Sequence, residues 1–345
     1  MPRLPPVSPP PSKFFSATAG VPLIRIDAMT DAIPSRDAAL LYVENRLGFD
    51  DQVLRPFPKW FLIETINACN ARCIMCGIDF DKNPNPRRMS DALFEKIARE
   101  IGQYHDHVEK VMLYLDGEPL LDKRLPRFIR TMKKNKVKIV NVASNASLLN
   151  EKLAQELMEA GLDEIYITVD SLKKEVYQAI RVGLDLDTVL DNIHRLIELR
   201  NHLKPSLVIR MQMVLQEKNL TEGDHFTHYW RTRLTAADQV VVRRAHNWGS
   251  QVAVHRFGGE DQANQIPCIA LWGTFVVHAD GTVPLCCMDT RSHYPLGHLN
   301  HESIAQIWGN AILAGYREKH LQRQRPDIRI CDGCTLWRDD QHEIG

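Results

Sequence analysis

Three cysteines lie within eight residues of one another near position 70 of this 345-residue chain. They are Cys69, Cys73 and Cys76, in the run Cys-Asn-Ala-Arg-Cys-Ile-Met-Cys. Three thiolates at this spacing can hold three corners of a cubane iron–sulfur cluster, which normally takes four cysteines. The fourth iron then keeps an open position, which distinguishes a reactive metal centre from a structural one. The triad therefore predicts a reactive cluster whose open iron can chelate an amine and a carboxylate.

The main alternative for three close cysteines is a zinc knuckle that a histidine completes. No histidine lies within a few residues of the triad, so zinc would need a distant fourth ligand. We therefore favour the iron–sulfur interpretation. A non-catalytic zinc or iron–sulfur scaffold is the rival hypothesis from another class of protein.

The other five cysteines all follow residue 267, and none lies between position 76 and position 268. This distribution predicts two metal sites in two parts of the chain. A four-cysteine zinc site is the alternative for the second group. Its members are Cys268, Cys286, Cys287, Cys331 and Cys334.

Composition narrows the range of partners and compartments. Lys plus Arg equals Asp plus Glu, 43 against 43, so no overall charge attracts nucleic acid or a membrane surface. No apolar run approaches the roughly 20 residues that span a bilayer, and the proline-rich N-terminus lacks a signal-peptide pattern. We expect a cytoplasmic protein, where clustered cysteines more often bind metal than form disulfides.

A strand–helix alternation surrounds the first triad. Helical periodicity, for example after the N-cap candidate Ser90, separates several of the strand-like runs. Such alternation predicts parallel β/α units, whose chemistry lies in the loops after the strands. The triad directly follows the first strand. The six runs are 60–66, 108–115, 137–142, 164–169, 207–214 and 239–242.

The alternation fades after about residue 250. A hairpin over 273–283, turning at Asp280-Gly281, and a helix over 301–320 are expected there. We predict three parts: a partly disordered extension at 1–56, a barrel at 57–250 and an auxiliary-cluster domain at 251–345. A short helix around 37–47 falls within the extension.

The triad resembles the Cys-x3-Cys-x2-Cys signature of the radical S-adenosylmethionine (SAM) superfamily. The resemblance implies an α/β fold, a partial (β/α)6 radical SAM barrel. It also implies that Cys69, Cys73 and Cys76 bind a 4Fe–4S cluster whose open iron holds SAM. Reductive cleavage of SAM would then yield a 5′-deoxyadenosyl radical that abstracts hydrogen from a substrate.

Two further elements resemble family motifs in the expected order. Gly117-Glu118-Pro119, after the second strand, resembles the Gly-Glu-Pro element that meets the SAM amino group. Ser144-Asn145, after the third strand, resembles Thr/Ser-Asn-Gly, although Ala146 replaces the glycine and leaves the contact geometry there open.

Three single residues extend the resemblance. Thr168, in Thr-Val-Asp-Ser after the fourth strand, matches a hydroxyl that approaches the SAM ribose. Arg181 lies where the family often has an arginine for the SAM carboxylate, with a solvated helical arginine as the alternative. Met75, before the third cysteine, would pack near the adenine.

The second cysteine group resembles the SPASM domain that follows many radical SAM barrels. Cys268, the Gly281-x4-Cys286 step and Cys331-x2-Cys334 match a shortened version called a twitch domain, with a β-hairpin and a helix. The resemblance implies one auxiliary 4Fe–4S cluster on Cys268, Cys286, Cys331 and Cys334. Cys287 is then a buried apolar residue, a ligand in place of Cys286, or a hydrogen-atom donor.

These elements predict a radical SAM oxidoreductase acting on a small polyhydroxylated substrate of the sugar or aminocyclitol type. The favoured reaction oxidises an alcohol to a carbonyl with electron transfer to the auxiliary cluster, so the enzyme is a dehydrogenase. A radical epimerase that uses Cys287, or a peptide-modifying maturase, is the alternative. Substrate-facing groups are expected in the segment 243–248, after the sixth strand. An electron donor such as flavodoxin or ferredoxin is the expected partner.

Overall fold

The computed structural model describes residues 35–48, 56–78, 86–249, 251–253, 264–334 and 336. All of them belong to one compact unit, Ile33–Gly345. The predictions for residues 1–34 and 49–55, including the disordered extension, lie outside the described residues. The domain boundary near residue 250 stays a prediction.

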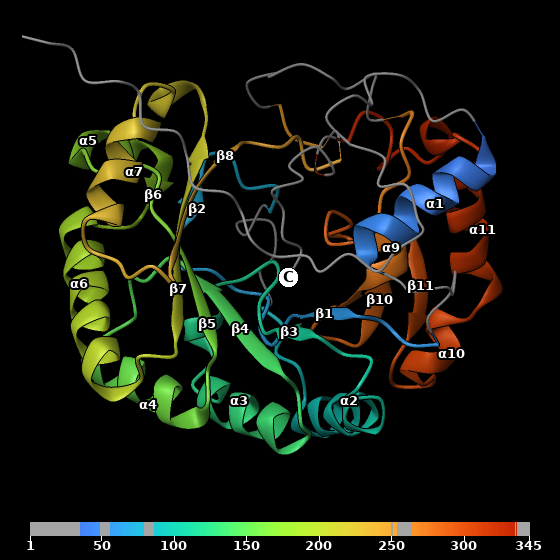
Figure 1. Ribbon diagram of the computed structural model, residues 1–345, viewed down its shortest axis with the longest axis horizontal. Helices are drawn as coiled ribbons and strands as arrows, with labels where there is room; N and C mark the ends of the chain where they lie inside the picture. Colours follow the sequence, from blue (N-terminus) through green and yellow to red (C-terminus); the bar gives the residue numbers. More distant parts are fainter. Residues whose placement is uncertain are drawn as a thin grey trace, which may run out of the picture. The chain divides into compact units, whose positions relative to one another are not determined.

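A parallel seven-stranded sheet forms the centre of this unit (Figure 1). Its strand order is β8-β7-β5-β4-β3-β1-β9, and every neighbouring pair is parallel. The six strands expected from the sequence are confirmed. The strands are β1 (Trp60–Ile63), β3 (Lys110–Met112), β4 (Ile139–Ser144), β5 (Glu164–Thr168), β7 (Val208–Leu215), β8 (Gln239–Arg244) and β9 (Thr274–Val277).

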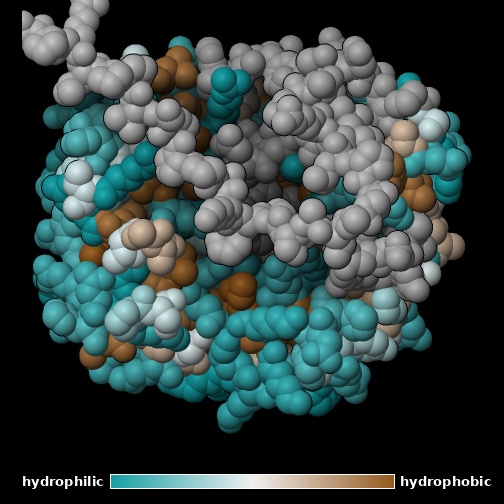
Figure 2. Space-filling model, in the orientation of Figure 1, coloured by the Kyte–Doolittle hydropathy of each residue, from teal (hydrophilic) through white to brown (hydrophobic). Residues whose placement is uncertain are grey.

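Helices connect the strands and cover the outer side of the sheet, as Figure 1 shows for its lower and left edges. Ser90 caps the first of them as expected, because its Oγ accepts a hydrogen bond of 3.1 Å from the Leu93 N–H. The exposed faces of the lower helices are mainly hydrophilic in Figure 2. The helices are α2 (Asp91–Gln103), α3 (Leu125–Lys134), α4 (Glu151–Ala160), α5 (Lys174–Ile180), α6 (Leu186–Leu203) and α7 (Gly223–Arg231). Two 3-10 turns, η3 (Pro119–Leu121) and η4 (Glu217–Asn219), follow strand ends.

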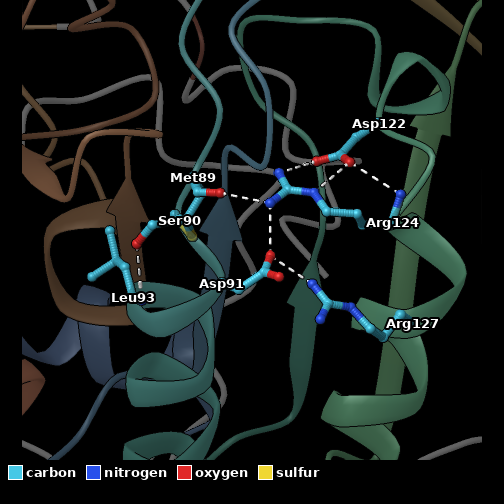
Figure 3. A network of polar contacts seen from close by, with 7 residues as sticks. All are labelled: Met89, Ser90, Asp91, Leu93, Asp122, Arg124 and Arg127. Atoms are coloured by element: carbon cyan, nitrogen blue, oxygen red, sulfur yellow. Dashed lines mark hydrogen bonds and ion pairs between the residues drawn. The ribbon is translucent and has the colours of Figure 1, made fainter.

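A polar network ties the start of α2 to the segment before α3 (Figure 3). The Arg124 guanidinium donates to both carboxylate oxygens of Asp122, at 2.9 and 2.8 Å, to the Met89 carbonyl at 3.0 Å and to Asp91 at 2.7 Å. Arg127 adds an ion pair of 2.5 Å to Asp91. The stacked rings of Phe94 and Phe128, 3.9 Å apart, pack beneath these groups.

The C-terminal elements lie beside β1 in Figure 1. The expected single helix over 301–320 is wrong, because two helices occupy this span and Asn310 caps the second by accepting from the Leu313 N–H at 2.9 Å. Helix α1 (Arg36–Leu47), close to the helix expected at 37–47, joins them through two hydrogen bonds of 2.9 Å from Arg36 to Glu318. The elements are α9 (Ala270–Gly273), β10 (Thr282–Pro284), β11 (Pro295–His298), α10 (Ile304–Trp308), α11 (Ala311–Leu321) and η5 (Arg325–Asp327).

The hairpin over 273–283 has different partners from those expected. Strand β9 pairs in parallel with β1, and β10 pairs antiparallel with β11. All four residues of β9 are buried, so this apolar strand is covered on both faces, as in a parallel sheet. The turn itself is present, since Gly281 adopts φ +97° and donates to the His278 carbonyl at 2.9 Å.

No helix among the described residues is long and apolar enough to cross a membrane.

Candidate functional site

The carboxyl ends of the barrel strands surround a cavity of about 390 Å³. Cys69, Cys73 and Cys76 all lie on its wall. The structure therefore brings the triad together with nearly every residue that the sequence assigned to SAM. Those on the wall are Met75, Gly117, Glu118, Ser144, Asn145, Thr168 and Arg181. Pro119 is not on the wall and instead begins η3.

A short two-stranded ribbon holds the cysteine loop in place. Strand β2 (Arg72–Cys73) pairs antiparallel with β6 (Arg181–Val182), and Cys73 lies opposite Arg181. The Arg181 Nη1 lies 3.4 Å from the Cys73 sulfur, and its Nε donates to Asp170 at 2.6 Å. Burial lowers the pKa of Arg181, but Asp170 and other nearby groups together raise that pKa above its usual value. Arg181 therefore keeps its positive charge beside the triad, and the sequence did not reveal this ribbon.

Glu118 connects two strand ends at the cavity. It is 3% exposed, and its carboxylate accepts from the Ser144 hydroxyl at 2.8 Å, the Asn145 N–H at 2.9 Å and the Leu120 N–H at 3.1 Å. Burial raises the pKa of Glu118, while these hydrogen bonds act in the opposite direction. The carboxylate is thus fixed in orientation before any ammonium group approaches it.

Two small residues fit the backbone closely around Glu118. A Cβ on Gly117 would lie 2.4 Å from the Ile66 carbonyl oxygen and 2.6 Å from that of Ala68, so only glycine fits there. Ala146 adopts φ +59°, the left-handed conformation that favours glycine. The replacement of the family glycine by Ala146 therefore leaves the backbone in a glycine-like conformation, at some cost in strain.

The spacing of the cysteines tests which metal group they fit. Two ligands of one zinc ion cannot lie more than about 4.6 Å apart, because each thiolate is about 2.3 Å from the metal. Across the described part of the chain, a single set of three His, Cys, Asp or Glu ligand atoms lies within 4.8 Å of one another, and it contains no cysteine. The sulfur atoms are therefore spread more widely than one zinc ion requires, and this spacing favours an iron–sulfur cluster.

Burial also favours the protonated form of two of these thiols, Cys69 and Cys76, in the absence of a metal group. It raises the pKa of Cys69, and it raises the pKa of Cys76 to about 11. Metal ligation requires thiolates, so loading the triad must release protons.

The five C-terminal cysteines form a second group. Cys331 and Cys334 are buried, and the other three are half-buried. Burial raises the pKa of Cys331 to about 12, and Cys268 and Cys334 add to the shift. Burial likewise raises the pKa of Cys287 to about 12, with contributions from Cys268 and Cys334. Because these thiols raise one another's pKa, their sulfur atoms lie near one another.

Buried side chains hold the loops of this second group. The Arg325 guanidinium, 1% exposed, donates to the carbonyl oxygens of Cys331 at 3.2 Å and Cys334 at 3.3 Å. His320 accepts a hydrogen bond from the Cys268 N–H at 3.1 Å. The backbone that carries three of the expected ligands is therefore fixed by the protein itself.

Further residues lie on the cavity wall, some of them in the segment 243–248, where substrate-facing groups were expected, and others not predicted from the sequence. Trp248 donates from its indole N–H to the Met75 carbonyl at 2.9 Å and packs against Gly77. Asp116 directly precedes Gly117 and lies on the cavity wall, although it was not predicted from the sequence. The segment 243–248 was expected to face the substrate, and four more of its residues reach the wall. The additional wall residues include Tyr114, Asp116, Tyr166, Arg210, Gln212, Arg243, Arg244, Ala245 and His246.

Comparison with known families agrees with this geometry. Residues 63–215 match the model of the radical SAM superfamily. The chain therefore contains a radical SAM domain over residues 63–215. Residues 268–335 match the SPASM model, described as an iron–sulfur cluster-binding domain. The first domain implies a 4Fe–4S cluster that acts with SAM, and the SPASM domain implies auxiliary iron–sulfur clusters.

Individual radical SAM proteins resemble parts of the chain. A probable GTP 3′,8-cyclase of Methanococcus maripaludis is 32% identical over 138 residues, which is 40% of this chain and 45% of that protein. The match thus spans less than half of that relative.

Two solved structures share the fold. BtrN in complex with AdoMet and 2-DOIA has a TM-score of 0.53 and 17% identity, covering 80% of this chain and 92% of BtrN. Streptococcus suis SuiB bound to its precursor peptide SuiA has a TM-score of 0.62 and 13% identity, covering 81% of this chain and 70% of SuiB.

Proposed function

We propose that this radical SAM enzyme oxidises a hydroxyl group of a small polyhydroxylated substrate, of the sugar or aminocyclitol type, to a carbonyl. Cys69, Cys73 and Cys76 would hold the SAM-binding cluster, and Cys268, Cys286, Cys331 and Cys334 the auxiliary cluster. When bound, these groups supply a 5′-deoxyadenosyl radical at one site and an electron acceptor at the other.

One observation carries the proposal: a single buried carboxyl, Asp116, lies within electrostatic reach of both cysteine groups. When ionised, Asp116 would raise the pKa of Cys76 in the triad and of Cys287 in the C-terminal group. Asp116 itself lies on the cavity wall. A substrate in the cavity is thus close to both sites, as an oxidation that uses both requires.

The size and polarity of the cavity agree with a small substrate. The cavity of about 390 Å³ would also hold SAM, so a substrate that enters beside it has to be small. Hydroxyl, amide and guanidinium groups of Tyr114, Gln212 and Arg210 on the wall can bind substrate hydroxyls. The BtrN structure, crystallised with 2-DOIA, supports this choice of substrate class by analogy of fold alone.

Residues around the triad would bind and orient SAM. Glu118 is oriented for the SAM ammonium and Arg181 for its carboxylate. Trp248 and Gly77 pack against each other on one side of the cavity and limit access of water there.

A radical epimerase is the second candidate, and the position of Cys287 favours it. Cys287 acts electrostatically on Tyr114, a wall residue, although it is not itself on the wall. A thiol this close to the cavity can return a hydrogen atom to a substrate carbon.

The experiment uses anaerobically reconstituted enzyme with a reductant, SAM and a substrate panel. The panel contains 2-DOIA, other aminocyclitols, sugars, GTP and a peptide mixture. A dehydrogenase forms 5′-deoxyadenosine together with a product that has lost two hydrogens. An epimerase in D2O incorporates one solvent deuterium instead. Flavodoxin and ferredoxin, our proposed partners for a cytoplasmic enzyme, are compared as reductants.

Two variants separate the candidates. Cys287→Ala leaves a dehydrogenase active but stops an epimerase after hydrogen abstraction. Cys73→Ala is the matched control that stops both. Zinc in place of iron, with no 5′-deoxyadenosine, contradicts both candidates.

A further inference from the structure

Three titratable side chains meet at the carboxyl ends of three neighbouring strands. Glu64 directly follows β1, His278 directly follows β9, and Asp116 lies four residues after β3. One ligand-type atom from each lies within 4.8 Å of the other two, and all three residues are buried. Strands β3, β1 and β9 are adjacent in the sheet, so the fold itself creates this cluster.

Asp116 is the member of the cluster that faces the cavity. It lies on the cavity wall, is 6% exposed, and its Oδ2 is buried with no hydrogen-bond partner among the described residues. A buried polar atom without a partner costs about 1–3 kcal/mol. The Asp116 carboxyl therefore carries an acceptor that no described residue satisfies, at the wall of the cavity.

Glu64 differs from Asp116 because both of its oxygens have donors. They accept from the Asn67 side chain at 3.0 Å and from the Ala279 N–H at 2.8 Å. These hydrogen bonds and the nearby His278 favour the ionised form of Glu64, whereas burial opposes it and raises its pKa. When the two carboxyls hold one proton between them, that proton therefore lies on Asp116.

We propose that Asp116 accepts the proton of the substrate hydroxyl, and that Glu64 and His278 are positioning residues that control how readily it does so. This inference rests on the proposed dehydrogenase reaction. The hydroxyl O–H bond breaks and a bond forms between that proton and a carboxylate oxygen of Asp116. The alcohol also loses one hydrogen atom from carbon to the 5′-deoxyadenosyl group and one electron to the oxidised auxiliary cluster, and so becomes a carbonyl.

Several charged or titratable groups surround this pair. Burial raises the pKa of Asp116 well above its usual value, and the Glu64 and Asp289 carboxylates raise it further. The groups near Asp116 are Glu64, Asp289, Cys76 and Cys287. The groups near Glu64 are His278 and Asp280, and Asp280 forms an ion pair with Arg87. A pH profile therefore reports the pair, and not Asp116 alone.

The direction of the pH dependence follows from this arrangement. Only unprotonated Asp116 can accept a proton, so turnover should rise with pH as the pair loses its shared proton. Glu64→Gln removes a neighbouring negative charge, which lowers the pKa of Asp116 and moves the rise to lower pH.

The first test needs no substrate. Infrared spectra of the reconstituted holoenzyme at neutral pH should show a protonated-carboxyl C=O band that shifts in D2O. The band should be lost in Asp116→Asn. In Glu64→Gln, as the pH is raised, the band should disappear at a lower pH than in the wild type. The matched control, Glu222→Gln, removes a buried carboxyl paired with Lys173 at 3.4 Å and should keep the band.

Two results of this test overturn the proposal. One is a wild-type spectrum in which the band is absent or is unaffected by Asp116→Asn. The other is a divalent cation other than iron that stays bound to the wild type and is lost in His278→Gln, because a cation would then take the place of the proton.

The second test uses the member of the substrate panel that the wild type oxidises, deuterated at carbon. Asp116→Asn should still transfer deuterium to 5′-deoxyadenosine, but carbonyl formation should fall about 100-fold. Unchanged carbonyl formation overturns the role of Asp116 while the dehydrogenase function stands. If the wild type oxidises no member of the panel, the dehydrogenase function fails, and this inference fails with it.

Discussion

At Gly117 the backbone leaves no room for a side chain. Because a Cβ there would lie 2.4 Å from a carbonyl oxygen, Gly117→Ala must displace the loop that carries Glu118. We expect this variant to lose about 1–3 kcal/mol of unfolding free energy, as overpacked sites do. Thermal unfolding of the anaerobically purified protein measures the change.

Gly315→Ala is the matched control. Nothing lies within 4 Å of a Cβ at this position in α11, so alanine should stabilise the helix by up to about 1 kcal/mol. Shifts of the same sign in the two variants would contradict the assignment of Gly117 as a close-approach site.

His246 predicts a pH dependence of stability. Burial, and then the positive charge of Arg243, lower the pKa of His246 from 6.5 to about 4. Between these values the unfolded chain binds a proton that the folded state does not. Stability therefore falls as pH decreases from 6.5 toward 4, by about 1.4 kcal/mol per pH unit from this group. Urea unfolding should show a shallower pH dependence for His246→Gln than for the wild type, and equal slopes would exclude this assignment.

Among the elements, the network in Figure 3 fixes α2 against the segment before α3. The Asp122 side chain is 1% exposed and depends on the two parallel bonds from Arg124, whose side chain is 28% exposed. Lysine cannot reproduce that bidentate contact. We expect Arg124→Lys to cost about 1–2 kcal/mol in denaturant unfolding, less than a fully buried pair because solvent screens Arg124.

Arg127→Lys is the control for this network. Its side chain is 47% exposed and makes one ion pair with Asp91, so the loss should stay below about 0.5 kcal/mol. Equal effects of the two substitutions would show that the bidentate contact is not what stabilises the junction.

Most elements of the barrel could be predicted because each is encoded locally. A buried parallel strand is a short apolar run, and Ser90 marks a helix start by its own hydrogen bond. The break between α10 and α11 was missed although Gly309 ends α10 and Asn310 caps α11, two residue types that mark helix ends in a sequence. The β2–β6 ribbon was missed because its two strands are two residues long and distant in sequence.

Across the whole molecule, the two separate cysteine groups predict that each group binds half of the iron. The holoenzyme should contain about eight irons, and the combined Cys69→Ala, Cys73→Ala, Cys76→Ala variant about four. The combined Cys268→Ala, Cys331→Ala, Cys334→Ala variant should also retain about four. Iron and sulfide analysis with electron paramagnetic resonance checks this. Loss of all iron in either variant would contradict independent sites.

The two cysteine sites could be predicted from the sequence, but the residues that line the cavity could be predicted only in part. The triad and the C-terminal cysteines carry their chemistry in their spacing. Asp116 and His278 carry none until the sheet brings distant strand ends together. Their ordinary residue types have no local signal, so only the three-dimensional arrangement identifies them.

The pairing of β9 with β1 has a consequence for handling the protein. Strand β9 covers the hydrogen-bonding edge of β1, the last strand that precedes the triad. A chain truncated before residue 264 would expose that edge, and an uncovered apolar strand is a template for pairing between molecules. We expect such a fragment to form aggregates detectable by size-exclusion chromatography and light scattering, whereas the full chain should not. The SPASM region, which contains β9, thus protects the barrel from self-association by covering the edge of β1.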